Sequence, residues 1–314
     1  MSDKPDPAER PNLSLKTRLY AWWEGYDLSG LRRRKDGEHG EGGDGQPQSK
    51  APEPGQNRWG KPLWSATRIE VAERLWGTGF NTPGGHDHIP YLVKPLGLNP
   101  AMSVLDLSAG LGGTSRVMAG KYGCWVTGLE ASPLLAKEGM QRSIKEGLEK
   151  KAVIEAYDPE RFSYPKRVDA IVYKEGLFTV RDKEQLFDGM ELTLKPRGQV
   201  LLTDYILGPQ GNRQAIAGWA EKEPQEPNLW SLEHMQNAFA QRNLDLRIHE
   251  DITDTHRHLI LSAIQAFVAV LEQYALAPQT KLAVMEEIEL WARRVAAMEA
   301  GLRCYRFYAL KPGE

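Results

Sequence analysis

A glycine-rich turn with an acidic residue just before it is the feature of this sequence best suited to bind a ligand. Residues 104–113 read VLDLSAGLGG, so an apolar stretch leads through Asp106 into a turn that contains Gly110 and Gly112. Glycines let the backbone adopt positive φ values and let a ligand approach the main chain closely. In doubly wound sheets such a turn lies at the sheet edge where ligands bind.

Two classes of ligand could use this turn. A nicotinamide dinucleotide calls for the pattern G-x-G-x-x-G, and Ser115 stands here at the third glycine position. The carboxylate of Asp106 would repel a pyrophosphate, whereas it suits the ammonium group of a cofactor that carries an amino acid. The sequence therefore favours a cofactor of the second class.

Two further acidic residues follow the next two predicted strands. Glu130 follows the stretch 124–129, where a carboxylate can accept hydrogen bonds from both hydroxyls of a ribose. Asp158 comes after Tyr157 and the stretch 153–156, where it could accept from an adenine amino group. Because parallel strands end at one edge of a sheet, we expect Asp106, Glu130 and Asp158 to ring a single cleft.

The elements that must position these residues alternate between strand and helix. Apolar strands separated by helices of about ten residues predict the α/β class, with a Rossmann-like doubly wound sheet. Residues 208–230 are predicted to be loop-like, and two long helices before the last strand are expected to complete a cap at about 208–300. Strands are expected at 103–107, 124–129, 153–156, 170–173, 199–205, 245–252 and 303–310, and helices at 69–76, 89–96, 114–121, 134–147, 183–194, 232–242, 256–276 and 279–300.

Residues 60–311 resemble the class I S-adenosylmethionine-dependent methyltransferases. The stretch from Asp106 to Gly112 is similar to the first motif of that family, and Glu130 matches the acidic residue of the second motif. The resemblance implies S-adenosylmethionine as the cofactor and a seven-stranded sheet whose last strand, here 303–310, is antiparallel. The cofactor-binding residues that it implies are Thr82, Asp106, Ser108, Gly110, Gly112, Glu130, Ala131, Tyr157 and Asp158.

A closer resemblance is to the phosphoethanolamine N-methyltransferases and related small-molecule enzymes. The stretch 76–85, WGTGFNTPGG, looks like the segment that closes over the methionine end of the cofactor in that family. Residues 202–205 and 250–254 look like its fifth and sixth strand endings, and Glu175 matches an acidic substrate-binding position. Thr179, however, stands where that family has a catalytic histidine, and Trp64 falls near its catalytic tyrosine. These departures weigh against phosphoethanolamine as the substrate.

Glu175 and His88 are the candidates for the catalytic base. Methyl transfer from a sulfonium is an in-line displacement, so the protein must chiefly align the acceptor and exclude water. An acceptor amine or phenol must also lose a proton, and Glu175 follows the fourth strand at the place that faces the methyl group. His86 and His88 are two residues apart with no third ligand nearby, so no metal site is expected. His256 and His258 are expected simply to begin the first long helix.

Composition sets the broad class of protein. A net charge of −2 weighs against a dedicated nucleic-acid binder, and 41% hydrophobic residues indicate a globular core. No signal peptide or membrane span is apparent, which predicts a cytoplasmic protein, with Cys124 and Cys304 as buried thiols. The domains expected are an amphipathic and basic segment at 1–35, a flexible linker at 36–57 and the methyltransferase domain at 58–314. Residues 13–35 could dock on protein or lie peripherally on the inner membrane surface.

The sequence thus predicts methyl transfer to nitrogen or oxygen of a small-molecule or lipid-like acceptor, with no nucleic-acid partner. Two alternatives stay open. One is a non-catalytic regulatory protein that binds S-adenosylmethionine on a methyltransferase scaffold, which the missing tyrosine–histidine pair suggests. The other is a methyltransferase that acts on RNA or protein.

Overall fold

The computed structural model describes residues 55–271 and 276–313. The segment expected at 1–35 and nearly all of the linker expected at 36–57 lie outside the described residues. The interpretations of residues 13–35 as a docking or membrane-binding helix therefore stay predictions.

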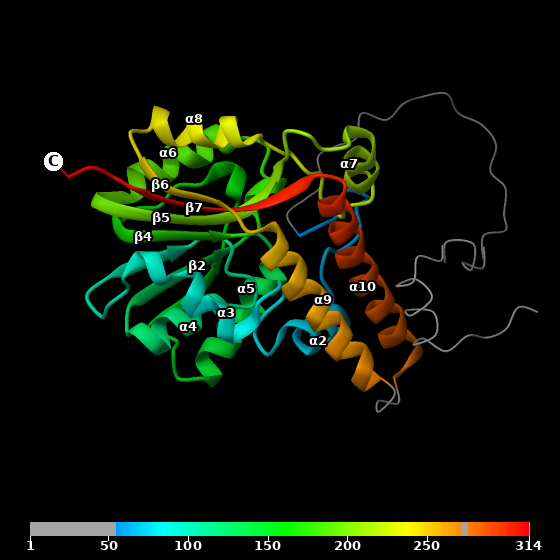
Figure 1. The fold of residues 1–314 in the computed structure, drawn as a ribbon. Helices are drawn as coiled ribbons and strands as arrows, with labels where there is room; N and C mark the ends of the chain where they lie inside the picture. Colours follow the sequence, from blue (N-terminus) through cyan, green and yellow to red (C-terminus); the bar gives the residue numbers. More distant parts are fainter. Residues whose placement is uncertain (1–54, 272–275, 314) are drawn as a thin grey trace, which may run out of the picture.

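A seven-stranded sheet forms the centre of the described structure (Figure 1). Its strand order is β3-β2-β1-β4-β5-β7-β6, and the reversal between β1 and β4 places a switch point at the end of β1. Adjacent strands from β3 to β5 pair in parallel, whereas β7 runs antiparallel to both β5 and β6, as the family resemblance implied. The strands are β1 (Ser103–Asp106), β2 (Trp125–Glu130), β3 (Ala152–Ala156), β4 (Val168–Lys174), β5 (Leu194–Leu207), β6 (Asp245–Asp251) and β7 (Leu302–Leu310).

Helices cover both faces of the sheet, because successive strand residues point to opposite faces. Val104 packs into a core with α3 and α4, whereas its neighbour Leu105 packs into a second core with α6 and α8. Figure 1 shows α6 and α8 above the sheet and α3 and α4 below it. The helices are α2 (Ala66–Trp76), α3 (Gly85–Leu92), α4 (Gly113–Tyr122), α5 (Pro133–Lys145), α6 (Lys183–Thr193), α7 (Arg213–Ala220), α8 (Leu232–Gln241), α9 (Thr253–Val270) and α10 (Pro278–Glu299), with short 3-10 helices η2 (Lys94–Leu96), η3 (Pro159–Arg161) and η4 (Leu177–Thr179).

Along the chain, the two long helices α9 and α10 follow β6 and precede β7. They lie at one end of the sheet together with α2 (Figure 1). Trp76 at the end of α2 meets Trp291 of α10 edge to face, with ring centroids 4.8 Å apart. Arg68 of α2 also pairs with Glu287 of α10 across 2.9 Å, and the Glu287 side chain is 2% exposed. These contacts join the helix that leads into residues 77–85 to the helices that arrive last in the chain.

Helix α7 is the main error in the predicted elements. Residues 208–230 were expected to be loop-like because prolines are frequent there, yet residues 213–220 form a helix. The Asn212 side chain caps this helix by accepting a hydrogen bond from the amide of Ala215. Ile216 and Trp219 are buried against the rest of the fold, so tertiary packing stabilises a helix too short to show a clear period.

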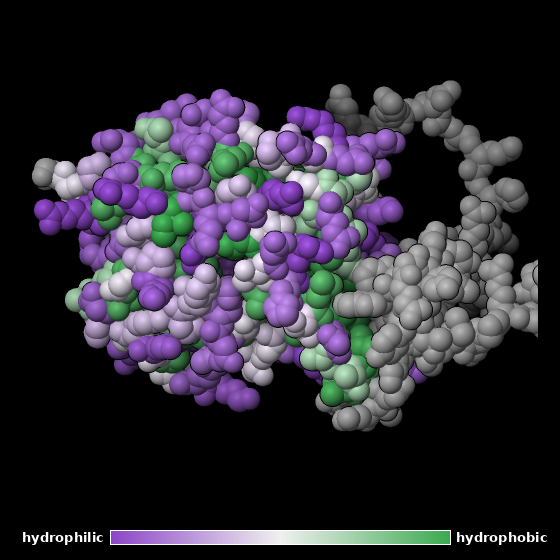
Figure 2. Space-filling model, viewed as in Figure 1, coloured by the Kyte–Doolittle hydropathy of each residue, from purple (hydrophilic) through white to green (hydrophobic). Residues whose placement is uncertain are grey.

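The face of the molecule seen in Figure 2 is largely hydrophilic, with smaller separate hydrophobic areas. Among the described residues, no helix is both long and apolar enough to cross a membrane.

Trp291→Ala should destabilise the protein, because it leaves a cavity between α10 and α2. Trp291 is 2% exposed, and removing a buried aromatic side chain of this size costs about 3–5 kcal/mol. Leu282→Ala on the same helix is the matched control, since Leu282 is 57% exposed and its loss should change stability by less than about 0.5 kcal/mol. Urea denaturation of both variants measures the difference, and equal midpoints would contradict this account of the α2–α10 contact.

Candidate functional site

The glycine turn after β1 has a backbone that glycine is needed to form. Gly110 has a φ of 55° and Gly112 a φ of 77°, both in the left-handed region. A Cβ atom on Gly110 would lie 2.1 Å from the side-chain oxygen of Asn81. Gly112 is the N-cap of α4, so the turn leads into a helix N-terminus, where unpaired amides favour negative or electron-rich groups.

Glu130, at the end of β2, reaches back to this turn. Its Oε2 accepts a hydrogen bond from the amide of Gly110 and its Oε1 from the amide of Ser132, each at 2.8 Å. Burial raises the pKa of Glu130 to about 7, although both amides and that of Ala131 act in the opposite direction. Taken as whole residues, Glu130 and Ala131 are both half-buried, while the Glu130 carboxylate itself is buried at the turn.

Asp106 lies beneath the turn and is fully buried. Its Oδ2 accepts a 2.7 Å hydrogen bond from the hydroxyl of Ser115, and its Oδ1 accepts from the amide of Ser108 at 3.3 Å. Burial raises the pKa of Asp106 to about 6. In this structure the Asp106 carboxylate therefore holds the turn from below. Ser115, which stands at the third glycine position of the dinucleotide pattern, is the residue whose hydroxyl binds this carboxylate.

Tyr157 and Asp158 follow β3, beside Glu130. The Tyr157 hydroxyl donates a 2.7 Å hydrogen bond to the carbonyl of Leu107, which ties the end of β3 to the end of β1. Asp158 is exposed and caps η3 by accepting from the amide of Glu160. The three acidic residues thus follow three adjacent strands, but their exposure rises from Asp106 through Glu130 to Asp158.

The donor set at this edge fits an adenosyl cofactor that carries an amino acid. The carboxylate of Glu130 can accept from ribose hydroxyls, and the exposed carboxylate of Asp158 can accept from an amino group. The glycine turn beside Glu130 offers main-chain atoms with no side chain at Gly110 or Gly112.

Lys174 connects this turn to a second group of residues. Its backbone amide donates to the hydroxyl of Ser108 at 2.6 Å. Its side chain is 6% exposed, and Nζ donates to the hydroxyl of Thr82 at 2.6 Å and pairs with Oε1 of Glu175 at 2.8 Å. One buried lysine thus contacts the turn, the segment 76–85 and the candidate catalytic carboxylate.

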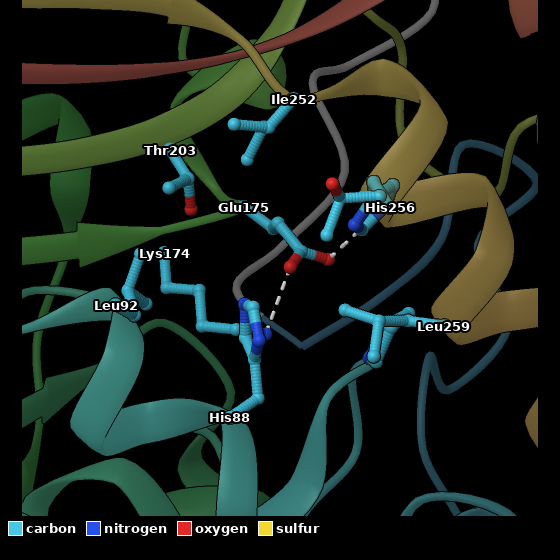
Figure 3. Close-up of a pocket in the computed structure, with 10 residues that line it drawn as sticks. His88, Leu92, Lys174, Glu175, Thr203, Ile252, His256 and Leu259 are labelled. Atoms are coloured by element: carbon cyan, nitrogen blue, oxygen red, sulfur yellow. Dashed lines mark ion pairs between the residues drawn. The ribbon is translucent and has the colours of Figure 1, made fainter.

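A pocket opens on the far side of Lys174, between the sheet edge and helix α9 (Figure 3). We call it the acceptor pocket, and it brings both predicted catalytic candidates together. It is lined by Pro83, His88, Leu92, Lys174, Glu175, Thr203, Ile252, Thr255, His256 and Leu259.

Glu175 is the most unusual residue of the acceptor pocket. Its φ of 59° puts a non-glycine residue in the left-handed region, which costs roughly 1–2 kcal/mol. Its side chain is 4% exposed, yet Oε2 has no hydrogen-bond partner. Burial by itself would raise the pKa of Glu175. The ammonium of Lys174 and the imidazole of His256 outweigh burial and hold this pKa below its usual value. The pocket therefore contains a buried carboxylate with one unused oxygen.

His256 and Tyr205 form a pair that the sequence analysis did not identify. Nε2 of His256 lies 2.8 Å from the Tyr205 hydroxyl and 3.8 Å from Oε2 of Glu175. Burial lowers the pKa of His256 to about 4, so the imidazole is neutral near pH 7. A signal was present in the helical spacing, because Ile260 and Ile264 follow His256 at intervals of four and are buried with it.

His88 lies on the opposite wall of the acceptor pocket. Burial, followed by the charge of Lys174, lowers the pKa of His88. His86, by contrast, is exposed and contacts only its neighbour Asp87, at 3.2 Å. In the described part of the chain, no three His, Cys, Asp or Glu side chains are grouped so that they could hold a metal ion.

The two positions at which the sequence departs from the related enzymes lie outside this pocket. Thr179 donates its hydroxyl hydrogen bond to the carbonyl of Gly176 at 2.9 Å, within its own turn. The guanidinium carbon of Arg68 lies 4.2 Å from the centroid of the Trp64 ring. Neither side chain lines the pocket. The tyrosine and histidine that do contact each other at this place, Tyr205 and His256, come from β5 and α9.

Comparison with known proteins agrees with this geometry. Residues 86–248 match the family described as the methyltransferase domain. Phosphoethanolamine N-methyltransferase 1 from Zea mays is 28% identical over 205 residues, which cover 65% of this chain and 40% of that protein. A glycine/sarcosine/dimethylglycine N-methyltransferase from Actinopolyspora halophila is 32% identical over 120 residues, or 38% of this chain and 21% of that protein. The chain thus spans about 40% of the length of the first of these relatives.

Among solved structures, phosphoethanolamine N-methyltransferase 2 from Haemonchus contortus, in complex with phosphomonomethylethanolamine and S-adenosylhomocysteine, has the same fold. The TM-score is 0.69 at 20% identity, over 80% of this chain and 62% of that one. The family match covers just over half of the chain, and it includes the glycine turn, Glu130 and Glu175. This chain therefore belongs to the methyltransferase domain family, as a class I S-adenosylmethionine-dependent member related to the phosphoethanolamine N-methyltransferases.

Proposed function

We propose that this protein transfers the methyl group of S-adenosylmethionine to a nitrogen atom of a small molecule bound in the acceptor pocket. The observation that carries the proposal is the unpartnered Oε2 of Glu175, which is buried and is connected to the glycine turn through Lys174. Buried polar atoms are nearly always hydrogen-bonded, so an unused carboxylate oxygen in a pocket calls for a ligand that donates. An amine supplies such a donor, and a protonated amine also supplies the opposite charge.

The residues of the pocket would orient the acceptor and exclude water. When it is bound, S-adenosylmethionine supplies an electrophilic methyl group on a sulfonium. Glu175 stays ionised near pH 7 because its pKa is lowered, so it can hold the acceptor nitrogen. Lys174 fixes the other oxygen of Glu175 and also contacts Thr82, which relates the acceptor position to the segment 76–85. Alignment of this kind can supply a large part of the rate enhancement of a displacement reaction.

Two neutral imidazoles are available to accept the proton that the nitrogen must lose. His88 and His256 both line the acceptor pocket, and both have a lowered pKa. The Tyr205 hydroxyl fixes the ring of His256, whereas the ring of His88 contacts that of Tyr91, with centroids 5.7 Å apart. The acceptor pocket is small and lies beneath α9, which suits a small acceptor better than a folded macromolecule.

Cofactor binding should weaken as the pH falls from 8 to 6. Ribose hydroxyls donate to an ionised Glu130, and its raised pKa of about 7 means that this form is lost as the pH drops through 7. A single group with that pKa raises the Kd for S-adenosylhomocysteine by about tenfold over this interval. Isothermal titration calorimetry at the two pH values tests this.

The variants of this experiment separate Glu130 from its neighbours. Glu130→Gln should bind more weakly at pH 8 and lose most of the pH dependence, whereas Glu155→Gln, an exposed carboxylate on the adjacent strand β3, should keep the behaviour of the wild type. A wild-type Kd that is equal at pH 6 and pH 8 would rule out this role for Glu130.

Glu175→Gln should lower kcat/KM for the acceptor by about a hundredfold, because the amide cannot pair with an ammonium group. The assay follows a labelled methyl group into a cell lysate separated into lipid, small-molecule and polymer fractions, and then into the purified acceptor. The Kd for S-adenosylhomocysteine should stay within about twofold of the wild-type value, which shows that the fold is retained.

Asp254→Asn is the matched control, because Asp254 lies at the start of α9 with a side chain that is 98% exposed. It should leave kcat/KM unchanged. Cofactor binding without labelled product in any fraction would refute the proposal and support a regulatory role, and label in the polymer fraction alone would point to a macromolecular acceptor.

A further inference from the structure

We infer that the methyl acceptor is an amine without a phosphate group, and that it carries a small uncharged substituent. The inference rests on the proposed function and names the class of substrate that the acceptor pocket would take. It follows from the balance of charge around the pocket and from the composition of its walls.

The pocket offers one carboxylate oxygen, Oε2 of Glu175, that is free to accept a hydrogen bond. Lys174 neutralises Glu175 through Oε1, at 2.8 Å, and leaves Oε2 turned toward His256 across 3.8 Å (Figure 3). No hydrogen bond reaches this oxygen. A ligand that places an ammonium or amine hydrogen there satisfies it, whereas an anionic group would be repelled by it.

The cations close to the pocket all have carboxylate partners. Those that act on Glu175, His88 or His256 are Lys174, Arg294 and Arg306. Lys174 is held by Glu175 and Thr82. Arg294 donates to both oxygens of Glu223, at 3.0 and 2.8 Å. Arg306 pairs with Glu250 through one terminal nitrogen, while its buried Nε has no hydrogen-bond partner.

A phosphate monoester would need such cations. It carries about −1.5 to −2 charges at pH 7, and proteins bind it with arginine or lysine side chains that are free to point at its oxygens. Among the residues that the structure describes, each cation that acts on the pocket is already balanced by a carboxylate, so a phosphate would bring negative charge that no further cation compensates. Breaking the pair of Arg294 would strand Glu223, whose side chain is 2% exposed.

The two histidines do not supply the missing charge. His256 faces Glu175, Lys174, Arg294 and His88, and its pKa of about 4 leaves it neutral near pH 7. The pKa of His88 is also lowered by burial and by Lys174. Both rings can therefore accept hydrogen bonds, but neither attracts a phosphate.

The remaining walls of the pocket carry no charge: most of their residues are apolar, and the polar groups are the hydroxyls of Thr203 and Thr255, of which that of Thr203 is buried without a hydrogen-bond partner. They combine the segment 76–85, helix α3 and the start of α9, so a substituent on the acceptor would contact aliphatic groups rather than charges. The apolar lining residues are Pro83, Leu92, Ile252 and Leu259.

A substrate panel on the wild-type protein tests this inference. Labelled-methyl transfer is measured with isobutylamine, ethanolamine and phosphoethanolamine, and kcat/KM is expected to be at least about tenfold lower with phosphoethanolamine than with either of the other two amines. Inorganic phosphate at millimolar concentration should not inhibit transfer to isobutylamine. Preferred turnover of phosphoethanolamine would overturn the inference and leave the proposed function standing. Absence of turnover with every amine, while S-adenosylhomocysteine still binds, would overturn both.

A variant that introduces a positive charge into the pocket gives a second, independent measurement. Leu259→Lys places an ammonium group on the apolar wall and should raise the ratio of kcat/KM for phosphoethanolamine over isobutylamine by about tenfold or more. Ser262→Lys, at an exposed position of the same helix, is the control and should leave the ratio at its wild-type value. A ratio that does not rise in Leu259→Lys, in a variant that binds S-adenosylhomocysteine normally, would contradict the assignment of an uncharged wall.

Discussion

The ion pair between Lys174 and Glu175 is the interaction on which the candidate site depends. Both side chains are almost fully buried, so each would be costly to leave without the other. The pair sits where β4 ends, beside the switch point of the sheet, and Lys174 adds hydrogen bonds to Ser108 in the cofactor turn and to Thr82. Because Lys174 contacts the glycine turn, Thr82 and Glu175, the position of the glycine turn and the position of the Glu175 carboxylate depend on each other.

The left-handed backbone of Glu175 is understandable in this setting. Its amide still donates to the carbonyl of Thr203 at 2.7 Å, so β4 and β5 stay paired up to the residue that bends away. The bend turns the carboxylate from the plane of the sheet toward α9, where His256 lies. Strain of this size persists only where the surroundings hold it, and here the holding contacts are the Lys174 ion pair and the β5 hydrogen bond.

The positions of the glycine turn and of the acidic strand ends could be predicted from the sequence because their signals are local. The turn with Gly110 and Gly112 and the acidic ends of β1 and β2 each lie within about ten residues of a clear apolar strand. The strand–helix alternation also predicted the α/β sheet. What could not be predicted is the direction in which the carboxylates point: Asp106 turns under the loop to Ser115 and Ser108, whereas Glu130 turns over it to Gly110. That choice is made by packing between elements.

The acceptor side was harder to predict because its residues come from distant parts of the chain. His256 meets Tyr205, 51 residues earlier, only because β6 returns the chain to the sheet edge before α9 begins. Helices α9 and α10 are held against α2 by Trp291 and Glu287, and α10 also carries Arg294, which fixes Glu223. The late insertion therefore supplies one wall of the acceptor pocket, while the cofactor side comes from the first strands. Substitutions in α9 can then change the acceptor while the cofactor residues stay as they are, which is how one methyltransferase scaffold can serve several substrates.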